Sequence, residues 1–175
     1  LPGAEALQGS REVNPEDCFT PLKEKAVEVP DYIEWLINED PEWQEHFSFD
    51  AFPIPLEFIG IEPALKKLDQ IWPINRLGLL RISSMTVYDW HVDQEREACV
   101  NLLYSIGSNS HTLFGSQRDP YEKDVIELQY EPDTFYLFNN QVEHTVINLD
   151  GPRYLFSLYF EEEKNYHSLK QLIHG

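Results

Sequence analysis

The sequence predicts a mainly β fold of the sandwich, jelly-roll or small-barrel type, with helices before and after it. From about residue 76, apolar and aromatic residues come in short runs, which is typical of strands. Turn-forming residues separate these runs. About seven closely spaced strands suit two packed sheets or a closed barrel better than one open sheet.

The predicted strands are short and follow one another closely. They cover residues 77–87, 98–106, 111–114, 125–130, 134–138, 144–149 and 153–160. Gly, Pro, Asn, Asp and Ser gather in the segments between them, at 107–109, 118–120, 131–133 and 150–152. The strand region therefore occupies residues 76 to 160.

Helices are expected on both sides of the strands. The first covers residues 30–37, with Asp31 as its N-cap and Pro41 beyond its end. The second follows Pro63, where apolar residues recur at helical spacing. A closing helix is predicted over residues 166–173.

Length and composition indicate one domain. Residues 1–28 are mostly polar with scattered Pro and Gly, and we interpret them as a partly ordered arm. Residues 29–175 would form a single domain with its β core at about 76–160, since 175 residues leave little room for two full cores.

Charge and hydropathy exclude some classes of partner. The net charge of −18 argues against binding to nucleic acid or to anionic membranes, because like charges repel. No apolar run approaches the roughly 18 residues that a membrane helix needs, and no signal peptide is visible. The expected setting is soluble and cytoplasmic.

His91 and Asp93 form the first half of a candidate metal site. Residues two apart on a strand point the same way, so the imidazole and the carboxylate can converge on one point. Glu95 is the rival carboxylate. The pair alone is weak, because such a tripeptide arises often by chance.

His144 supplies the second half. Val142, Val146 and Ile147 surround it in the sequence, a costly setting for an unpartnered imidazole. A core histidine bonded to a backbone carbonyl is the alternative. Two imidazoles and one carboxylate leave three coordination positions open, which is diagnostic of non-haem Fe(II) oxygenases.

Arg153 is suited to bind the distal carboxylate of a diacid that chelates the metal. If Asp150 and Gly151 form a two-residue hairpin turn, Arg153 lies on the same face as His144, about 13 Å away along the strands, and Ser157 pairs with His144. A guanidinium meets a carboxylate with forked, paired hydrogen bonds. The alternative is a surface arginine in an acidic protein.

These residues resemble the signature of the Fe(II)/2-oxoglutarate-dependent oxygenases: His91-x-Asp93, then His144, then Arg153. The resemblance covers about residues 76 to 160. Tyr88-x-x-His91-x-Asp93 is similar to the prolyl-hydroxylase branch, whereas residues 90–106 and 139–159 look closer to aspartyl/asparaginyl-hydroxylase-like proteins. Members of that second group often lack the carboxylate ligand, so Asp93 favours the general three-ligand scheme.

The resemblance implies a double-stranded β-helix, a jelly-roll or cupin-like barrel with two or three flanking helices. Fe(II) would bind His91, Asp93 and His144, and 2-oxoglutarate would chelate it with its 5-carboxylate on Arg153. With O2 as the third reactant, the enzyme would hydroxylate an amino-acid side chain, free or peptidyl, or a small metabolite, releasing succinate and CO2.

Further residues are candidates for contacts with the cosubstrate. They are Tyr88, Asn101, Tyr104 and Ser157. Packing is the alternative role for each. The remaining histidines have no partner pattern and are expected on the surface or in loops: His46, His111, His167 and His174.

Two other functions stay open. A cupin-like metal protein would use the same barrel for other chemistry, and a metal-free jelly-roll module would only bind a ligand. Arg153 separates the first from the oxygenase, since only the oxygenase needs a diacid anchor. Asp93 disfavours a halogenase, which needs a vacant position for halide. The substrate, the oligomeric state and the choice among hydroxylation, desaturation and cyclisation are left open.

Overall fold

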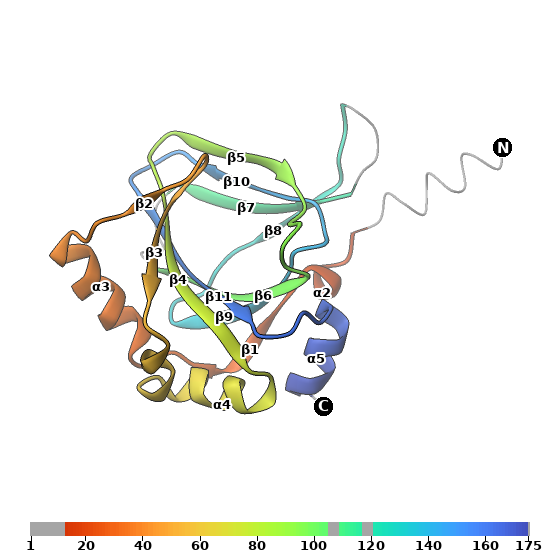
Figure 1. Cartoon of the computed structure of the whole chain (residues 1–175). Coiled ribbons are helices and arrows are strands. Elements are labelled where there is room, and N and C mark those ends of the chain that lie inside the picture. The colour runs from red at the N-terminus through yellow and green to blue at the C-terminus, as the bar shows by residue number, and fades with distance from the viewer. Residues whose placement is uncertain (1–12, 105–108, 117–120, 175) are drawn as a thin grey trace.

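Two antiparallel sheets face each other across the molecule (Figure 1). The computed structural model describes residues 13–104, 109–116 and 121–174. The larger sheet has the order β1-β9-β6-β11-β4-β3-β2, with strands β1 (Phe19–Lys25), β2 (Gln44–Glu45), β3 (Asp50–Ile54), β4 (Ile74–Ile82), β6 (Ala98–Tyr104), β9 (Thr134–Asn139) and β11 (Arg153–Phe160). The smaller sheet has the order β5-β10-β7-β8, with strands β5 (Thr86–His91), β7 (Ser110–Gly115), β8 (Val125–Leu128) and β10 (His144–Asn148). This is the jelly-roll arrangement.

Helices cover the outer side of the larger sheet. Figure 1 shows α3, α4 and α5 along that side, with the smaller sheet on the opposite side of the molecule. The helical elements are α2 (Pro15–Cys18), α3 (Val29–Glu39), the 3₁₀ helix η1 (Leu56–Gly60), α4 (Pro63–Ile71) and α5 (Tyr166–His174). The mainly β prediction with two or three flanking helices is confirmed, since α3, α4 and α5 lie where the sequence predicts helices.

One strand prediction needs correction, and three strands were missed. The run 77–87 is not one strand, because the chain leaves β4 at Ile82 and enters β5, in the other sheet, at Thr86. Met85 adopts a positive φ of 55° at this crossing. The sequence reading also missed β1, which pairs with β9, and the β2–β3 hairpin, which pairs with β4. Of the predicted turns, 118–120 and part of 107–109 lie outside the described residues.

The predicted hairpin between β10 and β11 is wrong. β10 pairs with β5 and β7 in the smaller sheet, while β11 pairs with β4 and β6 in the larger one. The segment around Asp150 and Gly151 therefore crosses between sheets instead of reversing within one. Asn148 fixes the crossing, because its side-chain amide donates to the carbonyls of Ser83 (2.9 Å) and Gly151 (3.0 Å).

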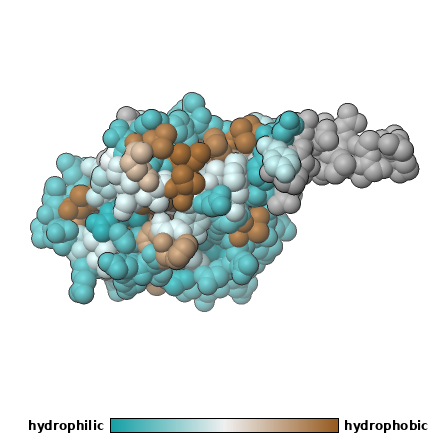
Figure 2. Space-filling model, turned by 90° about the horizontal axis from the view of Figure 1, so that it is seen from above, coloured by the Kyte–Doolittle hydropathy of each residue, from teal (hydrophilic) through white to brown (hydrophobic). Residues whose placement is uncertain are grey.

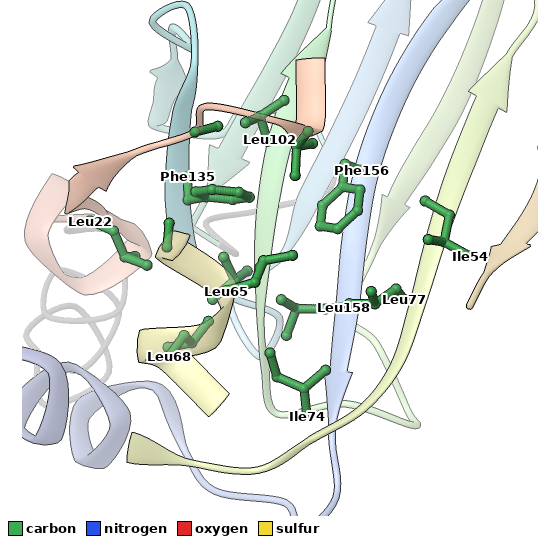
Figure 3. Close-up of a cluster of buried hydrophobic side chains, with 14 of the residues drawn as sticks. Leu22, Ile54, Leu65, Leu68, Ile74, Leu77, Leu102, Phe135, Phe156 and Leu158 are labelled. Atoms are coloured by element: carbon green, nitrogen blue, oxygen red, sulfur yellow. The ribbon is translucent and has the colours of Figure 1, made fainter. Parts of the chain in front are cut away.

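Two apolar clusters hold these layers together. The main one lies between the larger sheet and its helices (Figure 3). Leu65 and Leu68 of α4 meet Phe156 and Leu158 of β11 there, all at most 3% exposed. The second cluster lies between the sheets and contains Phe114, Phe138 and Tyr136. Burial of each large side chain stabilises the fold by about 1.5–3 kcal/mol.

The N-terminus of helix α3 is capped by a buried carboxylate that comes from another part of the chain. Glu62 is fully buried, and its Oε1 accepts hydrogen bonds from the backbone N–H groups of Val27, Glu28 and Val29 at 2.8–3.1 Å. The first N–H groups of a helix have no partner within the helix, and an anion there also suits the helix dipole. Glu62 thus joins α3 to α4, whose N-cap it is.

The surface is mostly polar. Figure 2 views the molecule from the side on which β5 and β10 lie in Figure 1, and shows apolar residues in small groups among polar ones. Of the helices in the described ranges, none is both long and apolar enough to span a membrane.

Candidate metal centre

Three side chains converge where β5 and β10 meet. His91 ends β5 and pairs in register with His144, the first residue of β10, and Asp93 follows two residues after β5. One ligand atom from each of the three lies within 4.8 Å of the others. Asp93 Oδ1 is 3.5 Å from His91 Nε2 and 3.8 Å from His144 Nε2. This spacing leaves room for an ion between the three atoms.

Both imidazoles are oriented by backbone carbonyls. His91 Nδ1 lies 2.6 Å from the carbonyl oxygen of Asp89, and His144 Nδ1 lies 2.7 Å from that of Val142. A carbonyl oxygen only accepts, so each Nδ1 carries the proton and donates. Each Nε2 therefore presents its lone pair toward the third ligand, as metal-binding histidines do.

The Asp93 carboxylate is held by its second oxygen. Oδ2 accepts from Asn140 Nδ2 at 2.7 Å and from Arg96 Nη2 at 3.2 Å, which leaves Oδ1 facing the histidines. The backbone N–H of Asp93 also donates to the carbonyl of Asn140 at 3.1 Å. The carboxylate is fixed before any ion is present.

Arg96 connects this carboxylate to the opposite sheet. Its Nη1 donates to Ser157 Oγ at 2.8 Å, and Ser157 Oγ donates to Asn101 Oδ1 at 2.6 Å. The guanidinium also lies over the Tyr159 ring, 4.4 Å from its centroid. Strands β6 and β11 thereby support the ligand set from across the cavity.

The pKa shifts of His144 and Asp93 favour the forms that bind a metal, whereas the pKa of His91 shifts the other way. Burial lowers the pKa of His144 to about 4, so this imidazole is neutral at neutral pH. Burial raises the pKa of Asp93, but the contacts with His91, Arg96 and His144 outweigh it and the net shift is downward. For His91, burial lowers the pKa and the contacts with Asp93 and Asp89 raise it further than burial lowers it.

The cluster opens into a cavity of about 920 Å³ between the two sheets. The smaller sheet contributes Tyr88, and the larger one contributes Asn101, Arg153 and Ser157. A volume of this size can take 2-oxoglutarate and a second small molecule together.

Arg153 lies in the same cavity with few partners. Its side chain is only 3% exposed, and its Nη2 donates to Thr112 Oγ1 at 2.8 Å. Its Nε has no hydrogen-bond partner, and neither has the hydroxyl of Tyr130, whose ring centroid lies 5.9 Å from the guanidinium. Within the described ranges no carboxylate pairs with it. Burial lowers the Arg153 pKa and raises that of Tyr130 to about 12.

These donors fit the groups that an Fe(II)/2-oxoglutarate site holds. Two imidazole nitrogens and one carboxylate oxygen on one side of an ion match the facial set of non-haem Fe(II) enzymes. A buried guanidinium without a counter-ion is costly, and an external carboxylate at Arg153 and Tyr130 would satisfy it.

The structure brings most of the predicted residues together. His91, Asp93 and His144 form the cluster, and Tyr88, Asn101, Arg153 and Ser157 line the cavity beside it. Arg153 and His144 share the cavity even though their strands belong to different sheets. The rival ligand Glu95 lines the cavity but stands outside the cluster.

Tyr104 is placed differently from the prediction, whereas His46 has a further position that the prediction did not include. Tyr104 lies three residues from Asn101 on β6, so it points to the opposite face and packs against the helix-side core. It does not line the cavity. His46 lies exposed in the loop between β2 and β3, as expected, and it also lines the cavity.

Sequence reasoning missed Arg96 and Asn140. The signal for Arg96 was its spacing, three residues after Asp93 in the acidic stretch Asp-Gln-Glu-Arg-Glu. Asn140 carries no such signal, because only the fold brings it to the Asp93 carboxylate.

Comparison with known proteins finds similar proteins by structure alone. No protein-family model and no curated protein matches the sequence. A prolyl-4-hydroxylase from Pseudomonas putida superposes with a TM-score of 0.61 and 10% identity, over 85% of this chain and 94% of that one. A 2OG-Fe(II) oxygenase family protein from Burkholderia pseudomallei gives 0.55 and 11%, over 93% and 92%.

A third neighbour was solved with a bound peptide. It is a prolyl hydroxylase from Trichoplax adhaerens in complex with a hypoxia-inducible-factor peptide fragment, with a TM-score of 0.57 and 12% identity over 98% of this chain and 95% of that one. At such identities the likeness establishes the fold alone. The predicted resemblance is confirmed at that level: this chain has the jelly-roll fold of the prolyl hydroxylases and other 2-oxoglutarate–Fe(II) oxygenases.

Proposed function

We propose that this chain is an Fe(II)- and 2-oxoglutarate-dependent dioxygenase that hydroxylates an amino-acid side chain, free or peptidyl, or a small metabolite, releasing succinate and CO2. One observation carries the proposal. A preorganised His-Asp-His cluster and a buried arginine without a counter-ion line the same cavity. A cupin-like metal protein with other chemistry has no need of the second feature.

His91, Asp93 and His144 would hold the metal, with their Nε2, Oδ1 and Nε2 atoms as ligands. When bound, Fe(II) with 2-oxoglutarate and O2 supplies an oxidative decarboxylation that is coupled to oxidation of a substrate C–H bond. These three protein ligands would leave coordination positions open for the two reactants. Asn140 and Arg96 keep the Asp93 carboxylate in place throughout, since their hydrogen bonds go to the oxygen that does not face the metal.

Arg153 would bind the distal carboxylate of 2-oxoglutarate. Thr112 holds one end of the guanidinium and orients it, while Nε and the Tyr130 hydroxyl remain available as donors. Hydrogen bonds to charged groups in such a site are about twice as strong as neutral ones. The two sheets exclude water around this pair, which strengthens the interaction further.

Either a peptide or a small molecule suits the cavity by size. The peptide-bound Trichoplax adhaerens enzyme supports a peptidyl substrate as one candidate. The 920 Å³ volume also admits a free amino acid or metabolite beside the cosubstrate.

Two measurements test the proposal. Fe(II) and 2-oxoglutarate are added without oxygen, and the visible charge-transfer absorption of the chelate is recorded; oxygen is then admitted and succinate is followed. The wild-type chain should give both signals. Asp93→Ala should remove both, and Arg153→Ala should weaken 2-oxoglutarate binding while Fe(II) still binds. Succinate formation that survives both changes would refute the assigned roles.

A further inference from the structure

Arg76 lies on the cavity wall without an anionic partner. It stands on β4 opposite Tyr159 of β11, and its guanidinium lies over that ring, 4.2 Å from the centroid. The side chain is exposed and lines the cavity. No hydrogen bond or ion pair links it to any residue that the structure describes. Its charge is therefore available to a ligand.

The cavity differs in charge from the rest of the chain. Its lining carries three arginines, Arg76, Arg96 and Arg153, and three carboxylates, Asp89, Asp93 and Glu95. The whole chain has 13 basic and 31 acidic residues. The cavity lining therefore lacks the excess of acidic residues that the whole chain has. Since Arg96 pairs with Asp93 and Arg153 faces the cosubstrate position, Arg76 is the cation left over in this lining.

Space lies next to Arg76 on the same wall. Gly78 follows it on the cavity face of β4 and pairs with Ser157. A Cβ atom added there would meet only the carbonyl oxygen of Phe52, at an ordinary 3.7 Å. The wall between Arg76 and Leu80 is therefore recessed by the missing side chain.

A row of rings forms the side of the cavity that leads to the metal. His46 stacks on Phe49 at 4.9 Å, and Phe49 lies 6.1 Å from Tyr88. Tyr88 in turn lies 4.2 Å from His91. The row begins on the β2–β3 hairpin and ends at a metal ligand, so an apolar group lying along it would be brought to the metal.

We propose that Arg76 binds a carboxylate of the substrate, so that the cavity takes an acidic small molecule whose apolar part lies along the aromatic row. The inference rests on the proposed function, which supplies the occupants of the His-Asp-His and Arg153 positions. A guanidinium suits a carboxylate because it donates two parallel hydrogen bonds. The Tyr159 ring supports the guanidinium from below and leaves its edge free for these bonds.

Matched pairs of ligands test this. N-acetyl amino acids, covering aliphatic and aromatic side chains, are each offered as the free acid and as the primary amide. Binding is measured by calorimetry without oxygen, with Fe(II) and saturating 2-oxoglutarate present. At least one acid should bind about 10- to 100-fold more tightly than its amide, the range expected for hydrogen bonds to a charged group.

Variants assign the preference to Arg76. Arg76→Gln should lower affinity for the acid to that for the amide, and Arg76→Lys should keep part of the difference. Arg81→Gln is the matched control, because Arg81 lies on the same strand, pairs with Asp50 and does not line the cavity. It should leave the acid-to-amide ratio unchanged.

The outcomes separate the two proposals. If the wild type fails to bind 2-oxoglutarate, the proposed function fails. If it binds 2-oxoglutarate but treats every acid like its amide, or if Arg76→Gln retains the preference, only the role of Arg76 is refuted. Binding of an unacidic peptide alone would also refute it.

Discussion

The two ends of the cavity are built on opposite principles. At the metal end each ligand is held by a protein partner: the imidazoles by backbone carbonyls and Asp93 by Asn140 and Arg96. At the other end Arg153 has one hydrogen bond, and both its Nε and the Tyr130 hydroxyl lack partners.

The difference matches the occupants proposed for the two ends. A metal ion needs ligand atoms at fixed positions, so preorganisation lowers the cost of binding. A carboxylate brings its own acceptor atoms, so the donors that await it are left unsatisfied in the free protein. A buried cation without a counter-ion costs stability, and we interpret that cost as the mark of a binding site.

The largest loss of activity should come from removing the Asp93 carboxylate. Asp93→Ala is expected to lower succinate formation by about a thousandfold, because a bound metal stabilises the reacting charges by several kcal/mol. Anaerobic calorimetry with Fe(II) should show weakened binding of the ion. Unchanged Fe(II) affinity would show that the cluster is not the metal site.

A change at the Arg153 end of the cavity should weaken binding of 2-oxoglutarate and not of the metal. Arg153→Ala is expected to raise the Kd of 2-oxoglutarate by about a hundredfold, since truncating one member of a buried charged pair costs about 2–5 kcal/mol. Fe(II) affinity should change less than about twofold, because Arg153 contacts none of the three ligands. An equal loss of both affinities would remove the distinction between the ends.

A change at Arg96 tests whether the residue that holds the Asp93 carboxylate affects metal affinity, as Asp93 itself should. Arg96→Lys keeps the charge but cannot reach both Asp93 and Ser157 with a planar fork. A drop of about 10- to 100-fold in Fe(II) affinity is expected, the range for partners of metal ligands. The matched control is Arg81→Lys, which should leave Fe(II) affinity as it is.

Stability offers a sharper contrast between the same two arginines. Arg96→Met leaves Asp93 without its cation and should lower the free energy of unfolding by about 1–3 kcal/mol. Arg153→Met should be neutral or stabilising by about 1–3 kcal/mol in the ligand-free protein, because it removes an unpaired buried charge. Urea denaturation of both variants measures this. A large loss for Arg153→Met would mean that its role is structural.

The smallest effect is expected at Tyr104, on the helix side of β6. Tyr104→Phe should change the KM for 2-oxoglutarate by less than about twofold, because the ring packs outside the cavity. Ser157→Ala, on the cavity face, is the comparison and should have the larger effect. A clear loss of 2-oxoglutarate affinity in Tyr104→Phe would restore the sequence-based role.

Local patterns predicted the helices, most strands and the metal cluster. Strand alternation predicted that His91 and Asp93 share one side, and the two do converge although Asp93 lies two residues beyond the end of β5. Long-range pairing was not predictable in the same way. The turn at Asp150 and Gly151 has hairpin composition, yet the flanking strands join different sheets, since the packing of the two sheets decides the path.

Asn140, which holds the Asp93 carboxylate, was hidden for the same reason. Asn140 reaches Asp93 from a segment 47 positions away, and β1 pairs with a strand more than a hundred positions away in the printed sequence. Arg96 is different, because it lies only three residues after Asp93 and its spacing was a local signal. Tyr104 illustrates a different error. Its spacing of three from Asn101 excludes a shared face on a strand, and the odd interval could have ruled it out.

The pairing of His91 with His144 has a consequence for how the protein matures. Those two residues become neighbours only when β5 and β10 align, and four strands, β6 to β9, lie between these two in the sequence. Such distant pairing slows folding, because the chain loses entropy before contacts repay it. If the cluster binds iron as proposed, the newly made polypeptide has no complete site for the ion until β5 and β10 have paired, and metallation would follow that step.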